Sequence, residues 1–128
     1  MSALTDRDID QIEEALGLRL PEDVRAQYRA SNGLRGPTNC QLLYTYKLSE
    51  NSDIVRVNSL RSEDWFPPAL RSTVLIGDDG VGNLVGYDWD KKRAILWNPE
   101  DGDWIQEQRE TVTDIWEHIR RFYESAAR

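Results

Sequence analysis

The order of its hydrophobic periodicities is the feature that most restricts what this chain can fold into. Two segments with helical spacing of apolar residues come first, short strand-like segments separated by turns follow, and a third helical segment comes last. Because the connections between the strand candidates are short, the strands are expected to pair antiparallel. This order predicts an α+β fold with two N-terminal helices, a central, mostly antiparallel sheet, and a C-terminal helix packed on it.

Local start and stop signals set the expected boundaries. Thr5 can cap the first helix and Gly17 can end it, whereas Pro21 opens the second helix and Asn32-Gly33 ends it. The last helix is expected from about residue 113 to 126. The strand candidates are residues 41–48, 73–76, 84–89, 93–97 and 104–108, and residues 49–72 are expected to form a loop with short strand or helix pieces.

The apolar positions on these segments define an expected core within one domain, residues 1–128. The residues predicted to be buried together are Ile12, Leu16, Tyr28, Ile76, Ile95, Trp97, Ile115, Ile119 and Phe122.

The charge balance restricts the class of partner. Lys and Arg number 16 and Asp and Glu number 23, so the net charge is 16 − 23 = −7. A nucleic-acid partner is not expected, since phosphate binding requires an excess of basic residues. An acidic surface suits a basic protein partner, although the same charge is equally explained by solubility. Five tryptophans exceed what a core of this size needs, and exposed tryptophan is typical of interfaces.

The sequence offers little for catalysis or metal binding. Cys40 and His118 are the only residues of their types, too few for a structural zinc site or a disulfide. The acidic segment 78–83 has neither calcium-loop spacing nor the lysine of a phosphate loop, and it is interpreted as a hairpin turn. No catalytic residue, metal or cofactor is therefore predicted, and an enzyme acting through an acidic pair is the remaining alternative.

No leader-like segment and no apolar run near the ~20 residues that span a bilayer occurs in the sequence, so a cytoplasmic location without membrane contact is expected. The expected oligomeric state is a monomer or a weak dimer.

One region combines acids with tryptophans. Residues 77–103 contain seven acidic residues against Lys91, Lys92 and Arg93, and tryptophans are interleaved with them. Such a surface could meet a basic cleft on a partner. The residues predicted to contact it are Trp65, Asp79, Asp88, Trp89, Asp90, Asp101, Asp103 and Trp104.

Two of the tryptophans have a competing interpretation. Trp97 alternates with Ile95, so it is favoured as a core residue. Trp89 shares a strand face with Val85 and Tyr87, and all three could be core instead of interface.

An ordered set of motifs resembles the SUKH superfamily. The set is Leu20-Pro21, Tyr28, Asn32-Gly33, Ile76-Gly77-Asp78-Asp79-Gly80, Gly82, a strand ending at Asp88, Ile95-Leu96-Trp97 and a final amphipathic helix. The resemblance covers residues from about 4 to 123. Val81 and Asn83 depart from the Gly and Asp frequent in the family, and Asn98-Pro99 replaces a common acidic or histidine-containing turn. The departures lie in loops and affect the partner surface more than the fold.

The resemblance implies an α+β fold, no enzymatic activity and no obligatory cofactor. Members of the superfamily include bacterial immunity proteins, which bind and neutralise polymorphic toxins, and fungal regulators of cell-wall synthesis. The leading hypothesis is an immunity protein against a toxin with a basic surface, such as a nuclease or a deaminase. The alternative is an intracellular regulatory or scaffold adaptor. The shared motif residues are structural in kind, so the resemblance assigns no functional site.

Overall fold

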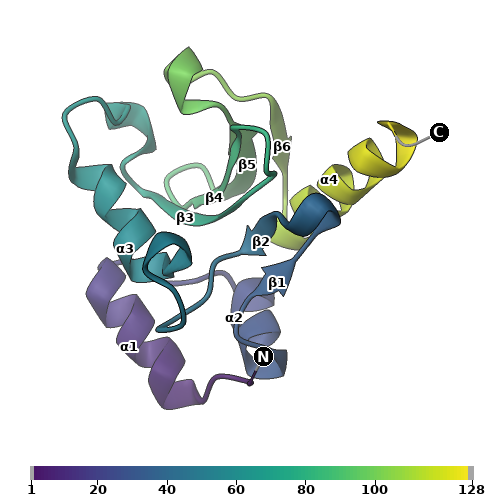
Figure 1. The fold of residues 1–128 in the computed structure, drawn as a ribbon. Coiled ribbons are helices and arrows are strands. Elements are labelled where there is room, and N and C mark those ends of the chain that lie inside the picture. The colour runs from purple at the N-terminus through teal and green to yellow at the C-terminus, as the bar shows by residue number, and fades with distance from the viewer. Residues whose placement is uncertain (1, 127–128) are drawn as a thin grey trace.

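The computed structural model describes residues 2–126 (Figure 1). The helices are α1 (Asp6–Leu16), α2 (Glu22–Ala30), α3 (Ile54–Asn58) and α4 (Val112–Ala126). The strands are β1 (Leu34–Arg35), β2 (Gln41–Leu43), β3 (Thr73–Asp78), β4 (Leu84–Asp88), β5 (Arg93–Trp97) and β6 (Glu107–Arg109). The predicted α+β fold is confirmed, including both N-terminal helices and the C-terminal helix.

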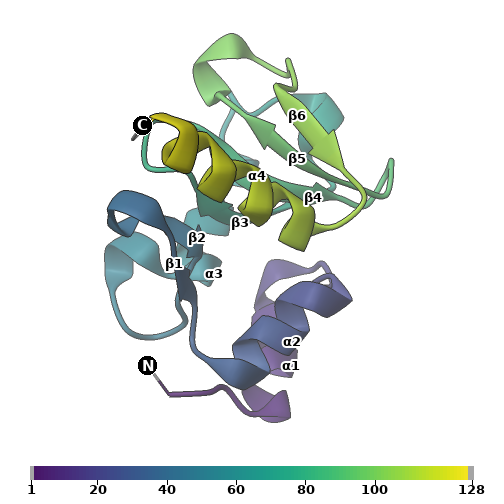
Figure 2. The ribbon, with the colours of Figure 1, turned by 90° about the vertical axis from the view of Figure 1, so that its right-hand side faces the viewer.

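The last four strands form one antiparallel sheet in the order β3-β4-β5-β6. Each neighbouring pair is consecutive in the chain, as the short connections predict. In the centre of the sheet Gly86 pairs with Ile95. The β1–β2 hairpin lies beside β3, where the Tyr44 amide donates to the Ile76 carbonyl at 2.9 Å. Figure 2 shows α4 lying across one face of the sheet.

The helix boundaries follow the local signals. Thr5 and Asp8 form a complete capping box, in which each side chain accepts a hydrogen bond from the other residue's backbone amide. Gly17 ends α1 in the left-handed conformation at φ 70°, which glycine adopts without steric cost. The predictions for both ends of this helix are therefore confirmed.

Residues 49–72, expected to form a loop with short strand or helix pieces, contain the short helix α3 and three single 3-10 turns. Asp53 caps α3 by accepting hydrogen bonds from the amides of Val55 and Arg56, both at 3.1 Å. Buried Asn58 then donates to the Leu75 carbonyl at 2.9 Å and accepts from the Leu75 amide at 2.8 Å, which ties α3 to β3. The strand predicted over 41–48 ends at residue 43, and the one predicted over 104–108 is displaced to 107–109.

The apolar residues form two clusters, one on each face of the sheet. The larger one joins α1, α2 and α4 to the face of β3, β4 and β5 that carries Ile76 and Val85. The smaller cluster lies on the other face and consists of Phe66, Leu70, Leu75, Ile95 and Trp97. Successive residues of a strand point to opposite faces of the sheet. Ile95 and Trp97 share a face with Leu75, so Ile76, the residue after Leu75, lies on the other face.

Eight of the nine predicted core residues are therefore buried, but not together: six belong to the larger cluster, and Ile95 and Trp97 belong to the smaller one. Trp97 is fully buried, which confirms its interpretation as a core residue. Phe122 is 58% exposed and packs edge-on against Tyr123 at a centroid distance of 5.7 Å, so its prediction as a core residue is wrong. The C-terminal end of α4 extends beyond the sheet (Figure 1).

Candidate protein-binding surface

The segment between α3 and β3 places one tryptophan at the edge of the smaller cluster. Phe66 and Leu70 are buried there, and the Phe66 ring meets Trp97 edge-on at a centroid distance of 6.4 Å. Trp65 packs on the outer side of Phe66 at 5.8 Å and is 51% exposed. One side of the Trp65 indole therefore packs against Phe66, which itself packs on Trp97, and the other side is exposed to solvent.

Two arginines hold this segment in place. Arg61 donates to the carbonyls of Leu16 and Arg71, and Arg71 donates back to the Arg61 carbonyl at 2.7 Å. Partial burial lowers the pKa of Arg61. Both guanidinium groups bind backbone carbonyls, so they do not neutralise the acidic side chains that precede Trp65.

The turn after β5 places a second exposed tryptophan next to a residue that packs against the same cluster. The Asn98 side chain accepts a hydrogen bond from the Glu100 amide at 2.9 Å, and Gly102 turns the chain at φ 70°. Ile105 packs against the smaller cluster, whereas Trp104 beside it is 61% exposed. Trp65 and Trp104 thus each immediately precede a residue of the same apolar cluster.

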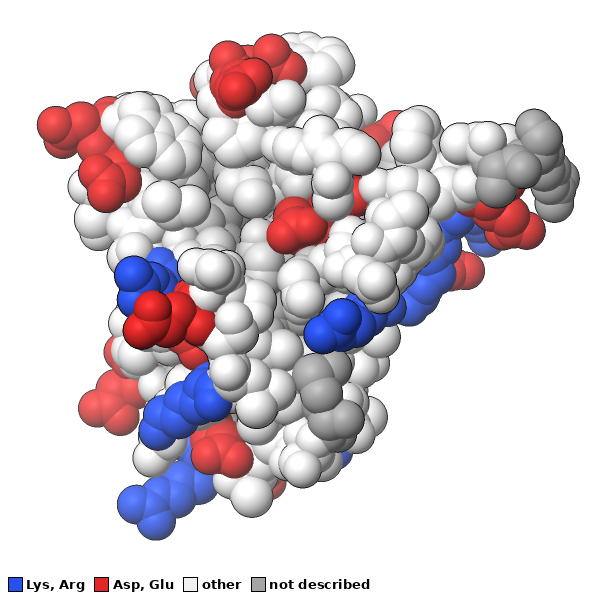
Figure 3. All heavy atoms as spheres, in the orientation of Figure 1, with Lys and Arg blue, Asp and Glu red and all other residues white. Residues whose placement is uncertain are grey.

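Exposed acidic residues accompany both tryptophans. Glu63 and Asp64 precede Trp65, and Glu100, Asp101 and Asp103 precede Trp104. Figure 3 shows acidic atoms gathered at the tips of these two segments, whereas the Lys and Arg atoms in that view lie lower down or along α4. We call the set of Glu63, Asp64, Trp65, Glu100, Asp101, Asp103 and Trp104 the tryptophan rim.

Glu63 and Asp64 were missed by the sequence analysis. The signal that could have found them is the repetition of one pattern, since acids directly precede an exposed tryptophan in both segments.

Two residues predicted to contact a partner are buried instead. Asp79 accepts hydrogen bonds from the amides of Val81 and Asn83 and from the Asn83 side chain, so its carboxylate shapes the β3–β4 turn. Its carbonyl accepts from the Tyr123 hydroxyl. Asp88 is fully buried and accepts from the Asp90 amide at 3.0 Å in the next hairpin. Both carboxylates serve turns, which corrects the prediction that they face a partner.

Asp88 also binds Arg93 across the hairpin, at 3.4 Å from Nε to the carboxylate. Replacing Asp88 by Ala is expected to lower the free energy of unfolding by about 2 kcal/mol, because the Asp90 amide and Arg93 both lose a partner. Asp90→Ala is the matched control; its side chain is exposed, so a change within about 0.5 kcal/mol is expected. Urea denaturation of both variants checks this, and equal midpoints would contradict the role given to Asp88.

Trp89 and Asp90 lie apart from the tryptophan rim. Trp89 is half-buried against the larger cluster, on the other face of the sheet, and its indole donates to the Arg19 carbonyl at 2.7 Å. Asp90 is exposed in the turn that precedes the first residue of β5, whereas Trp104 follows the last residue of β5, so the two lie toward opposite ends of this strand. Of the eight predicted contact residues, the structure brings Trp65, Asp101, Asp103 and Trp104 to the smaller cluster and leaves these two elsewhere.

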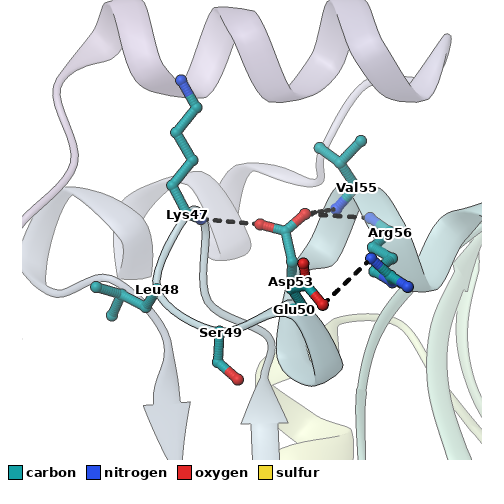
Figure 4. A pocket seen from close by; sticks show the side chains of 7 residues that line it. All are labelled: Lys47, Leu48, Ser49, Glu50, Asp53, Val55 and Arg56. Atoms are coloured by element: carbon teal, nitrogen blue, oxygen red, sulfur yellow. Dashed lines mark hydrogen bonds and ion pairs between the residues drawn. The ribbon is translucent and has the colours of Figure 1, made fainter.

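A surface hollow beside α3 does not assemble a reactive group. It lies between Lys47 and Arg56, and Figure 4 shows the carboxylate of Asp53 occupied by the backbone amides of Lys47, Val55 and Arg56. Glu50 pairs with Arg56 at 3.7 Å. The Asp53 side chain therefore serves the local turn, and Glu50 and Arg56 form a surface ion pair.

The lone cysteine and histidine lie apart. Cys40 is buried just before β2, and burial raises the pKa of its thiol. His118 is partly exposed on α4, 3.9 Å from a Glu107 carboxylate oxygen. Within residues 2–126 no group of three or more His, Cys, Asp or Glu side chains is placed to hold a metal ion.

None of the helices within residues 2–126 is both long and apolar enough to cross a membrane.

Fold and surface together define an α+β domain whose most distinctive feature is an acidic, tryptophan-bearing surface. The SMI1 / KNR4 family (SUKH-1) matches residues 3–125, and the chain belongs to this family. The resemblance seen in the sequence is thereby confirmed. Members of the family are generally non-catalytic, with immunity or regulatory roles. No curated protein and no solved structure matches the chain significantly.

Proposed function

We propose that this protein is an immunity protein that binds a toxin domain with a basic surface through the tryptophan rim, and so neutralises it. The observation that carries the proposal is the pair of half-exposed tryptophans, Trp65 and Trp104, beside one apolar cluster and each preceded by acids. Family membership supports the same class of function.

The two indoles have the properties of binding anchors. Tryptophan is enriched among the residues that dominate interface energies, because a rigid ring buries a large apolar area at low entropic cost. Trp65 rests on buried Phe66, and the Trp104 turn is fixed by Asn98 and Gly102, so little ordering is required on binding.

The acids supply the electrostatic part of recognition. Lys and Arg side chains that a nuclease or deaminase toxin directs at nucleic-acid phosphates would instead meet the acids of the rim. Such contacts accelerate association. Their effect falls as salt rises, because at physiological ionic strength exposed charges more than about 8–10 Å apart are largely screened. The proposal includes a cytoplasmic site of action, where a toxin of this kind reaches nucleic acid, and a monomeric or weakly dimeric protein.

The test is co-expression with the toxin encoded beside this protein, together with binding kinetics. Trp104→Ala and Trp65→Ala are each expected to weaken binding by about tenfold or more, chiefly through faster dissociation. Asp101→Lys with Asp103→Lys is expected to slow association and to reduce its salt dependence. Asp10→Lys with Glu14→Lys, two exposed changes on α1 outside the rim, is the matched charge control and should still protect cells.

Unchanged kinetics and protection in every folded rim variant would show that the toxin meets another surface. If the wild-type protein protects against no neighbouring toxin, the immunity function is wrong and the regulatory adaptor takes its place.

A further inference from the structure

A second surface feature lies on the opposite face of the sheet from the tryptophan rim. A pocket of about 490 Å³ opens between α2, the end of β4 and the chain just before α4. Tyr87 and Trp89 contribute its aromatic surface, and Glu22, Asp23 and Glu110 contribute carboxylates. None of the residues that line it is basic.

The aromatic pair is held in a fixed arrangement. Tyr87 and Trp89 meet edge-on, with ring centroids 4.8 Å apart. The Trp89 indole N–H is used by the Arg19 carbonyl at 2.7 Å, and its backbone amide by the Ser72 carbonyl at 3.1 Å. Both rings are only half-buried, so part of each ring stays accessible from the pocket.

The three carboxylates differ in what they already bind. Asp23 accepts the backbone amide and hydroxyl of Thr113, at 2.7 and 2.9 Å, which fixes it between α2 and α4. Glu22 pairs with Arg29 at 3.3 Å on the exposed surface. Glu110 is exposed and has no ion-pair partner among residues 2–126.

Nearby acidic residues also affect the pKa of Tyr87. The pKa of the Tyr87 hydroxyl is raised, first by burial and then by the negative charges of Asp23 and Asp88. Burial disfavours any charge there, whereas the negative charges of Asp23 and Asp88 disfavour a further anion and attract a cation.

We infer that this pocket binds the side chain of an arginine on a protein partner. A guanidinium group stacks on aromatic faces and presents a planar set of donors that matches carboxylates, and its methylene stem suits the apolar surface of Pro21 and Ala26. The inference rests on the proposed function in taking the partner to be a protein. It adds an arginine contact remote from Trp65 and Trp104, on the other face of the sheet.

Nuclear magnetic resonance of the five indole N–H groups tests this without any toxin. The probe is the blocked tripeptide acetyl-Gly-Arg-Gly-amide, with the Gln and Lys tripeptides as matched probes. A saturable shift of the Trp89 indole resonance is expected with the Arg peptide, with a dissociation constant on the order of millimolar, as one side chain can provide. The Lys peptide should bind several-fold more weakly, and the Gln peptide should give no saturable shift.

Variants of the pocket separate it from general attraction to an acidic protein. Glu22→Gln with Glu110→Gln is expected to weaken Arg-peptide binding at least threefold, whereas Glu14→Gln, an exposed change on α1, should leave it unchanged. The inference is overturned if the Trp89 resonance does not saturate, if the Gln peptide shifts it equally, or if Trp65 and Trp104 shift as much as Trp89.

The outcome is independent of the toxin experiment. Loss of toxin protection in the rim variants with no peptide response at Trp89 would support the proposed function and remove the pocket from it. A peptide response in a protein that protects against no toxin would retain the pocket and reject immunity.

Discussion

Replacing Trp97 by Ala is expected to lower the free energy of unfolding by about 3–5 kcal/mol, enough to threaten a domain of ordinary stability. The indole is fully buried in the smaller cluster, where it meets the Phe66 ring edge-on. It also lies over Gly86, and a methyl group there would come within 3.1 Å of the indole. Removing the ring leaves a cavity beneath the segment that carries Trp65.

Two further variants make the prediction specific. The Trp97 indole N–H is buried with no hydrogen-bond partner within residues 2–126, so Trp97→Phe removes an unsatisfied donor and should cost only about 1–2 kcal/mol. Phe122→Ala is the exposed aromatic control and should cost less than about 1 kcal/mol. Urea denaturation monitored by circular dichroism measures all three. A Trp97→Ala midpoint equal to that of Phe122→Ala would mean that the smaller cluster is not packed as described.

Replacing Gly77 by Ala is expected to destabilise the protein by about 3 kcal/mol or more, beyond the usual range for overpacking. A methyl group at this position would lie 2.2 Å from the Leu42 carbonyl oxygen and 2.4 Å from that of Gln41. These atoms belong to the backbone of β2 and cannot move aside as a flexible side chain can. The substitution therefore separates the β1–β2 hairpin from β3.

Gly102→Ala provides the contrasting control. No atom lies within 4 Å of the added methyl group, so its only cost is the positive φ of 70°, about 1–2 kcal/mol. Thermal and urea denaturation of the two variants should rank Gly77→Ala well below Gly102→Ala in stability. The reverse order would show that the close approach of β2 to β3 is not what requires glycine. Gly77 belongs to the motif on which the family resemblance rests, and this contact is the physical reason for a glycine there.

Local signals in the sequence were sufficient for most of the secondary structure. The capping box of Thr5, the left-handed stop at Gly17 and the hairpin turns each depend on residues within a few positions, so their structure does not depend on the rest of the fold. The sequence allowed for a short helix or strand piece in residues 49–72 but did not specify α3, because the stability of this helix comes from distant partners. Its Asn58 is satisfied by Leu75, which is 17 positions away in the sequence.

The candidate surface was only partly predictable for the same reason. Composition identified acids and surplus tryptophans, and Trp65 and Trp104 are indeed exposed. Sequence alone could not distinguish Asp88, which is buried to hold a turn, from Asp90, which is exposed two residues later. An acidic side chain becomes structural when backbone amides converge on it, and that convergence exists only once the hairpin has formed.

The sequence by itself determined the order of helices and strands, the antiparallel pairing and the acidic character, because each depends on periodicity, short connections or charge count. The tertiary structure alone decided which side of the sheet each aromatic residue faces and whether anything covers it. Trp97 is enclosed because the Phe66 segment folds over it, whereas Phe122, on the amphipathic helix α4, stays 58% exposed. Whether a side chain is buried depends on which residues pack against it. For both aromatic residues, segments distant in the chain decide this.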